Sequence, residues 1–308
     1  MSEARVAGAI GIAGPALGSG AGTSVAELRR ALGLLLAGRV DEPDAEARDV
    51  IAAVADKPRL WPSSHPDAWL AEEIVMRARR AAAQRLRGAP FAYAVGRAAF
   101  RHLTLDVDDR VLIPRQETEV LVDVVLEWTR TRGAGGLAID VGTGSGAIAL
   151  ALSNEGAFER VVATDISTSA VEVARANAAR LAGALRAPVE FRQGALFAPV
   201  RGERARVVVS NPPYIAYREM KELPPSVRDW EPPAALYAGD GGMAMIAALA
   251  REAAAVLEPG GLLAMEIDCR RGAACAELLR AQGCYHDVRV RPDLTGRDRV
   301  LTATRQDG

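Results

Sequence analysis

The sequence predicts an α/β fold, in which a parallel β-sheet is covered by helices on both faces and is preceded by a small helical domain. Beyond Gly133, short apolar runs rich in β-branched residues alternate with helical stretches, and strands buried on both faces of a parallel sheet are typically such continuous runs. A glycine-rich turn directly follows the first run and opens a helix. With 308 residues, the chain has room for one large domain and one small one.

The N-terminal part is predicted to contain three helices. Ser24 and Glu27 form a capping box at the start of the first helix, and apolar residues follow them at helical spacing. A second helix is expected over residues 44–55 and a third over about 67–87. The expected organisation is a flexible tail at residues 1–22, a helical domain at 23–96, a β-hairpin linker at 97–113 and the sheet domain at 114–308.

The linker is predicted to be a β-hairpin because apolar residues alternate between Phe100 and Ile113. Its turn is expected at Asp108 and Asp109, and Pro114 ends its second strand. In the sheet domain, the expected strands are residues 137–141, 161–164, 189–192, 207–210 and 262–267, with room for two more in 288–304, and the expected helices include 167–181 and 243–257.

The charge of the chain argues against a nucleic-acid or membrane partner. The formal net charge is −1, and residues 1–96 carry 12 basic against 11 acidic side chains, whereas a DNA-binding arm would be clearly basic. The three cysteines are odd in number and lack the spacing of zinc ligands. No metal is therefore expected, and a reduced, cytoplasmic compartment fits best. Glu3 and Pro15 interrupt the Gly- and Ala-rich start, which indicates a flexible tail rather than an export signal.

The glycine-rich turn predicts a site for a cofactor that contains adenosine. Glycines let the backbone turn sharply and approach a ligand, and free N–H groups at the start of a helix favour a polar or anionic group. Asp165 ends the next strand, where a carboxylate can accept hydrogen bonds from both hydroxyls of a ribose. The turn fits a Rossmann-like nicotinamide or flavin enzyme and a methyltransferase equally well. Its residues are Gly142, Thr143, Gly144, Ser145 and Gly146.

The tetrapeptide after the fourth strand favours methyl transfer. In open parallel sheets, ligands bind beyond the carboxyl ends of the strands, so the tetrapeptide is expected beside the glycine-rich turn. The Asn211 side-chain oxygen and the Pro212 carbonyl can accept both N–H bonds of a planar NH₂ group, and Tyr214 offers a flat face to it. A plain loop is the alternative, since Asn-Pro and Pro-Pro are common loop dipeptides. The tetrapeptide is Asn211, Pro212, Pro213 and Tyr214.

With both motifs in place, the chain resembles the release-factor glutamine methyltransferases, the HemK or PrmC family. The likeness covers roughly residues 24–304. Beyond the two motifs it includes Pro90-Phe91-Ala92-Tyr93, Glu231-Pro232 and, as its most specific parts, Pro114-Arg115-Gln116-Glu117-Thr118-Glu119 and Asp293-Leu294-Thr295-Gly296-Arg297-Asp298-Arg299.

The resemblance implies a seven-stranded S-adenosylmethionine-dependent methyltransferase domain, with its last strand antiparallel, behind an N-terminal helical domain that recognises the substrate. It implies methylation of the glutamine in the Gly-Gly-Gln motif of class I peptide chain release factors, in the cytoplasm and without a metal. Carried over by position, residues 142–146 and Asp165 bind the cofactor, residues 211–214 grip the substrate glutamine, and Asn211 also lies near the cofactor.

Three positions depart from the family's usual pattern. Gln116 stands where Pro is usual, residues 268–271 replace a strand exit that contains glycine, and Ala195-Leu196 replace an acidic and aromatic pair. That acid commonly contacts the adenine, so the way in which the adenine is held stays open. Three alternatives also stay open: an acceptor amine on adenine in nucleic acid, a glutamine of another protein such as a ribosomal protein, and a non-catalytic module that binds an adenosine ligand.

Overall fold

The computed structural model describes residues 22–307, and the chain divides into two compact units between Leu86 and Arg87. The tail expected at residues 1–22 lies outside the described residues except for Gly22. No described helix is long and apolar enough to cross a membrane.

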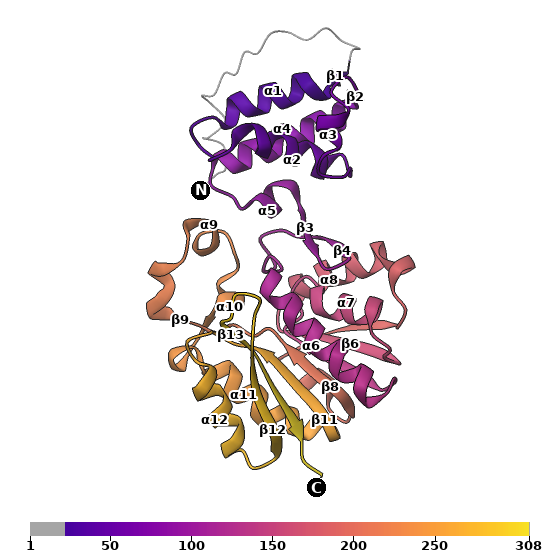
Figure 1. Cartoon of the computed structure of the whole chain (residues 1–308), viewed down its shortest axis with the longest axis vertical. Coiled ribbons are helices and arrows are strands. Elements are labelled where there is room, and N and C mark those ends of the chain that lie inside the picture. The colour runs from indigo at the N-terminus through magenta and orange to yellow at the C-terminus, as the bar shows by residue number, and fades with distance from the viewer. Residues whose placement is uncertain (1–21, 308) are drawn as a thin grey trace, which may run out of the picture. The chain divides into compact units, whose positions relative to one another are not determined.

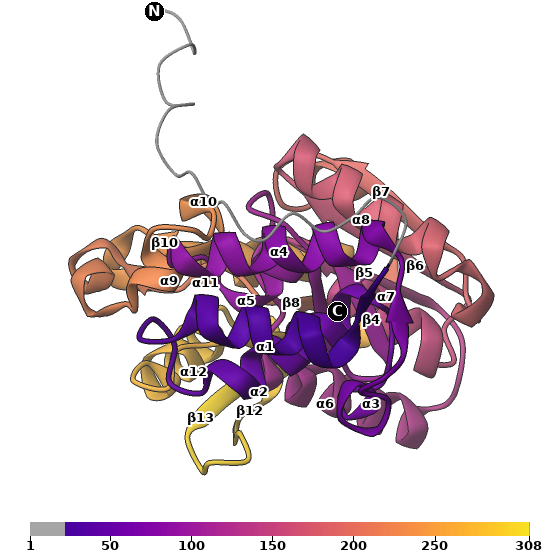
Figure 2. The same cartoon turned by 90° about the horizontal axis from the view of Figure 1, so that it is seen from above.

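The first unit is a small helical bundle, in which α1 (Val25–Leu36), α2 (Pro43–Val54) and α4 (Glu72–Leu86) pack side by side (Figure 2). The predicted capping box is present: the Ser24 hydroxyl accepts from the Glu27 N–H, and the Glu27 carboxylate accepts from the Ser24 N–H at 3.0 Å. The third long helix begins at Glu72 rather than near residue 67, because β2 (Trp69–Leu70) pairs antiparallel with β1 (Thr23–Ser24). A short α3 (Trp61–Ser64) precedes β2.

The second unit begins with α5 (Phe91–Val95) and a β-hairpin of β3 (Arg97–Phe100) and β4 (Leu103–Asp106). The prediction of a hairpin turn at Asp108 and Asp109 was wrong, because the chain turns at Arg101 and His102. Arg101 adopts a φ of 52° there, and its side chain pairs with the Glu155 carboxylate at 2.6 and 2.8 Å. Asp108 and Asp109 do form a turn, but it lies beyond the hairpin.

The sheet of this unit has seven strands in the order β12-β13-β11-β8-β5-β6-β7. Neighbouring strands are parallel except around β13, which pairs antiparallel with both β11 and β12. The expected seven-stranded sheet with an antiparallel last strand is thereby confirmed. The strands are β5 (Leu137–Val141), β6 (Arg160–Asp165), β7 (Val189–Gln193), β8 (Ala205–Ser210), β11 (Leu257–Glu266), β12 (Tyr285–Pro292) and β13 (Asp298–Arg305).

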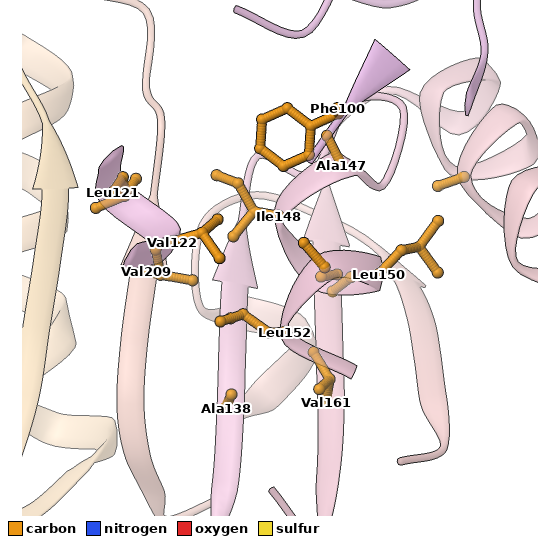
Figure 3. Packing of buried hydrophobic residues seen from close by; sticks show 14 of the residues in the cluster. Phe100, Leu121, Val122, Ala138, Ala147, Ile148, Leu150, Leu152, Val161 and Val209 are labelled. Carbon is orange, nitrogen blue, oxygen red and sulfur yellow. The ribbon is translucent and has the colours of Figure 1, made fainter. Parts of the chain in front are cut away.

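Helices cover both faces of the sheet (Figure 1). On one face, α6 (Gln116–Arg132), α7 (Ala147–Glu155) and α8 (Thr168–Arg180) pack on Ala138, Val161 and Val209 together with Phe100 of the hairpin (Figure 3). On the other face, α11 (Ala244–Val256) and α12 (Gly272–Ala281) pack on the alternate strand residues. Strands buried on both sides account for the apolar runs of the sequence.

A long excursion of short elements separates β8 from α11, and we call residues 211–243 the β8–α11 segment. Its β9 (Ile215–Ala216) pairs parallel with β10 (Tyr237–Ala238). The other short elements are η3 (Tyr217–Glu222), α9 (Pro225–Arg228), α10 (Pro233–Leu236) and η4 (Asp240–Gly242) in this segment, and η1 (Ala182–Ala184) and η2 (Ala198–Val200) around β7.

Candidate active site at the carboxyl edge of the sheet

The glycine-rich turn lies between β5 and α7, as the sequence predicts. Gly142, Gly144 and Gly146 all have positive φ, with values of 77°, 54° and 86°, a conformation that costs glycine little. The N–H groups of Gly142 and Thr143 both donate to the Thr164 carbonyl, at 2.8 and 2.9 Å. The turn is therefore tied to β6 and held at the carboxyl end of the sheet.

The buried Asp140 carboxyl, near the end of β5, stabilises the turn through hydrogen bonds. Oδ2 of Asp140 accepts from the Thr143 hydroxyl at 2.7 Å and from the Ala149 N–H at 3.2 Å. Its Oδ1 has no hydrogen-bond partner among the described residues. Burial raises the pKa of Asp140 to about 7, because the charged form is poorly solvated there.

Asp165 ends β6 and fixes the outer part of the turn. Its Oδ2 accepts from the Gly144 N–H at 2.9 Å, and its Oδ1 accepts from the Ser167 N–H at the same distance. The side chain is only half-buried, so its oxygens can also accept hydrogen bonds from a ligand.

A cavity of about 380 Å³ opens above the turn, within the range of roughly 300–1,000 Å³ typical of small-molecule sites. Gly142, Gly144, Asp165 and Asn211 line it, whereas Thr143, Ser145 and Gly146 lie within the turn and shape it. A Cβ atom added to Gly142 or Gly144 would meet nothing within 4 Å. The backbone there is therefore open to a ligand, as a cofactor cradle requires.

The remaining walls of the cavity come from residues that the sequence analysis did not select. Ile166 and Leu196 are apolar walls near Asp165, and Ala195, at the position of the family's adenine-binding acid, also lines the cavity. No local pattern marks these residues, since several come from segments that meet only in the folded chain. The others are Arg110, Val111, Leu112, Val141, Thr164, Ser167, Ala170, Gly194, Ser210, Pro232, Ala234, Ala235, Met245 and Leu249.

The Asn-Pro-Pro-Tyr tetrapeptide follows β8 directly. The Ser210 hydroxyl donates to the Val141 carbonyl at 2.7 Å and ties the start of the tetrapeptide to the end of β5. Asn211, Pro212 and Pro213 line the cavity. The structure thus brings Asn211 and the glycine-rich turn to the same cavity. Tyr214 is oriented differently: its hydroxyl donates to Oε1 of Glu266 at 3.0 Å, and the flat face expected of it stays a prediction.

Two residues that the sequence analysis did not assign to the site support the tetrapeptide. Glu266 is buried at the end of β11, and its Oε2 accepts from the Thr118 hydroxyl at 2.6 Å. Oγ1 of Thr118 accepts in turn from Nδ2 of Asn211 at 3.0 Å. Burial raises the pKa of Glu266, an effect opposed by the bonds from Thr118 and Tyr214. A lone carboxylate at the end of an apolar strand was the sequence signal that could have identified Glu266.

One ion pair joins two walls of the cavity. Glu231, which is buried, accepts from the Ile113 N–H at 3.2 Å and pairs with the Arg115 guanidinium. We call this contact the Glu231 clasp. It ties residues 110–112, which follow the hairpin, to residues 232–235 of the β8–α11 segment, and both stretches contribute lining residues.

Known proteins match both units of the chain. A family model described as "PrmC N-terminal domain" matches residues 27–96, and one described as "Methyltransferase small domain" matches residues 116–223. The release factor glutamine methyltransferase of Moorella thermoacetica is 42% identical over 286 residues, which cover 91% of this chain and 99% of that protein. Its namesake from Cereibacter sphaeroides is 40% identical over 277 residues, or 90% and 96% of the two chains.

A solved structure shares the fold of about two thirds of the chain. A methyltransferase from Pyrococcus furiosus superposes with a TM-score of 0.51 at 20% identity and covers 68% of this chain and 92% of its own. The two curated relatives go further, since their identity extends over nine-tenths of the chain. Sequence identity of about 40% over nine-tenths of the chain indicates more than a common fold. It shows that this chain belongs to the release factor glutamine methyltransferase family.

Proposed function

We propose that this chain transfers a methyl group from S-adenosylmethionine to the side-chain amide of the glutamine in the Gly-Gly-Gln motif of class I peptide chain release factors. The observation that carries the proposal is the position of Asn211 and Pro212 in the wall of the cavity that Gly142 and Gly144 also line. The two acceptors that can hold an NH₂ group therefore lie in the same cavity as the glycine-rich turn that can bind the cofactor. Release factors act in translation, so a cytoplasmic location follows from the same proposal.

The residues of the cavity fit the cofactor. Bound there, S-adenosylmethionine would supply a methyl group activated by the adjoining sulfonium. Gly142 and Gly144 leave their backbone open to it, and the half-buried Asp165 carboxylate suits the ribose hydroxyls. Ala195 and Leu196 provide no carboxylate for the adenine, so apolar contact with Leu196 and Ile166 would hold that ring.

Asn211 and Pro212 would prepare a weak nucleophile. An amide nitrogen shares its lone pair with the carbonyl, and acceptors on both of its N–H bonds orient it and return electron density to it. Bound S-adenosylmethionine would supply the methyl group as its carbon–sulfur bond breaks, and the protonated N-methyl amide that results would release one proton to water. Because no strong base is required, orientation and electrostatic complementarity would supply most of the rate.

Transfer of a labelled methyl group tests the proposal. The purified chain, labelled cofactor and a class I release factor should yield a singly methylated Gly-Gly-Gln glutamine by mass spectrometry. Replacing Asn211 with Ala should lower kcat on the order of 10²–10³-fold, as expected when one preorganised partner of a reacting group is lost. Asn154→Ala is the matched control, since Asn154 donates to the Ala184 carbonyl away from the cavity residues.

Cofactor affinity, measured by calorimetry, should be largely preserved in Asn211→Ala. Label on adenine in RNA or DNA instead of on the release factor would contradict the proposed substrate and favour the amino-methyltransferase alternative. Label on a ribosomal protein alone would keep the chemistry and change the partner. Full activity of Asn211→Ala would remove the observation on which the proposal rests.

A further inference from the structure

The orientation of the Asn211 carboxamide matters because its two ends have nearly the same shape and opposite hydrogen-bonding character. The oxygen can accept from an amide NH₂ group. A carboxamide rotated by 180° would present its own NH₂ group to the substrate and could accept nothing. Any enzyme that uses this side chain as an acceptor therefore needs a device that selects one orientation.

The donors and acceptors around Asn211 provide such a device. An ionised Glu266 can only accept hydrogen bonds, and its Oε2 accepts one from the Thr118 hydroxyl at 2.6 Å. A hydroxyl has one proton, so Oγ1 of Thr118 is left as an acceptor and meets Nδ2 of Asn211 at 3.0 Å. The amide nitrogen is thereby assigned to the side of Thr118. The oxygen at the opposite end stays available to the cavity that Asn211 lines.

Burial shields these bonds from water, but it also raises the pKa of Glu266, so the assignment applies to the ionised carboxylate. Thr118 and Glu266 are both buried, so water does not compete for the hydroxyl proton. The other carboxylate oxygen accepts from the Tyr214 hydroxyl at 3.0 Å. Arg299 faces the same carboxylate, and its charge favours the ionised form, whereas Glu117 and burial oppose it. Arg299 is itself held by Asp293 at 3.2 Å.

We propose that Thr118 and Glu266 are positioning residues, which hold the Asn211 carboxamide with its oxygen directed towards the substrate amide. We call the chain of bonds from Glu266 through Thr118 to Asn211 the amide relay. The inference rests on the proposed function, because it concerns the same acceptor. It assigns a role to the Thr118 hydroxyl, which reaches no reacting atom and acts only through Asn211.

Substitutions at Thr118 separate the relay from simple packing. Thr118→Val keeps the shape of the side chain and removes its hydroxyl, and it should lower kcat on the order of tenfold or more, or about 1.4 kcal/mol of transition-state stabilisation. Thr118→Ser keeps the hydroxyl and should restore most of the rate, with Thr118→Cys between them. Thr129→Val is the matched control: Thr129 is also buried on α6, and its hydroxyl donates to the Leu126 carbonyl at 3.0 Å.

Two readouts do not depend on turnover. The side-chain NH₂ resonances of Asn211, observed by NMR in the absence of cofactor, should shift in Thr118→Val and stay near their wild-type positions in Thr118→Ser and Thr129→Val. Calorimetry should give the same cofactor affinity for all four proteins. KM for the release factor should also change little, because the relay acts on the reacting nitrogen rather than on docking.

The outcomes distinguish the two proposals. If the wild-type chain labels no release factor, the proposed function fails, whereas the NMR comparison still tests the relay. Wild-type kcat in Thr118→Val, or an equal loss in Thr118→Ser, would overturn the relay. A fall in activity matched by an equal fall in cofactor affinity would also overturn it. Should Thr118→Val not fold, the graded Thr118→Ser and Thr118→Cys pair carries the same test.

Discussion

At the scale of single residues, two buried carboxyls of the active-site edge differ in how they are satisfied. Glu266 has a hydroxyl on each of its oxygens, from Thr118 and Tyr214. Asp140 has partners on Oδ2 only, and its Oδ1 has none among the described residues. The charge of Asp140 is therefore poorly compensated, and its proton is held until about pH 7.

This difference predicts a pH dependence of stability. The pKa of the Asp140 carboxyl is about 4 in an unfolded chain, whereas in the folded chain it is about 7. Between these values the folded chain binds more protons than the unfolded chain, so the free energy of unfolding should fall as pH rises. Tm measured without cofactor should decrease over that window, and Asp140→Asn should flatten the decrease. An unchanged slope in the variant would assign the titration to another group.

At the scale of elements, the site is built where segments distant in sequence meet. The Glu231 clasp joins the stretch after the hairpin to the β8–α11 segment. A second contact fixes the first of these stretches, since the Tyr93 hydroxyl donates to the Val111 carbonyl at 2.5 Å. The stretch after the hairpin is thus held by side-chain contacts, whereas the β8–α11 segment also contains the β9–β10 pair.

The two members of the clasp should not be equivalent. Glu231 has a side-chain exposure of 1% and Arg115 one of 32%. Arg115→Met would leave a buried carboxylate with the Ile113 N–H, and it should lower the free energy of unfolding by about 1–3 kcal/mol. Glu231→Gln keeps an acceptor for that N–H and leaves a guanidinium that water can reach, so its loss should be smaller. Urea unfolding of both variants measures the two losses of unfolding free energy. A larger loss in Glu231→Gln than in Arg115→Met would contradict this account of the Glu231 clasp.

The sequence predicted the elements whose signal is local and missed those that depend on tertiary contacts. Continuous apolar runs placed the parallel strands, and the capping box at Ser24 placed the start of α1. The hairpin turn was misplaced because apolar alternation continues past Asp106, so the pattern alone does not show where β4 ends. The short elements of the β8–α11 segment are stabilised by contacts such as Glu231 with Arg115, which no periodicity reveals.

The same distinction holds for the candidate site. Glycines and the tetrapeptide are contiguous motifs, and the structure brings Gly142, Gly144, Asp165 and Asn211 to one cavity. Thr118 and Glu266 are 148 positions apart, and their partnership exists only because α6 packs beside the end of β11. The sequence could have singled out Glu266 as a carboxylate at the end of an apolar strand, but it could not pair it with Thr118.

At the scale of the whole molecule, the two units have separate tasks in our proposal. Every residue that lines the cofactor cavity belongs to the second unit, which also has its own two apolar clusters. The first unit exposes the apolar side chains of Leu34, Leu60 and Trp69, and the family resemblance implies a recognition role for it. The helical domain was predicted at residues 23–96, of which residues up to 86 fall in the first unit, and we propose that this unit recognises the release factor.

A chain that begins at Arg87 tests this division. It should bind the cofactor with unchanged affinity, because it keeps the whole cavity lining. Its KM for the release factor should rise about tenfold or more, which corresponds to about 1.4 kcal/mol of lost binding free energy. A short Gly-Gly-Gln peptide, which lacks the rest of the release factor, should be methylated equally by both chains. An unchanged KM for the intact factor would contradict a recognition role for the first unit.

The antiparallel strand β13 connects β12 to the rest of the sheet. β12 joins the sheet only through β13, which inserts between β12 and β11 and pairs Val300 with Glu266. The parallel strands β5, β6, β8 and β11 pair with one another without β13, so native-state hydrogen exchange tests whether they stay protected when β13 opens. Without β13, β11 is an open edge and Glu266 lacks the nearby charge of Arg299. The glycine-rich turn, which lies on interior strands, therefore depends less on β13 than does the amide relay at the end of β11.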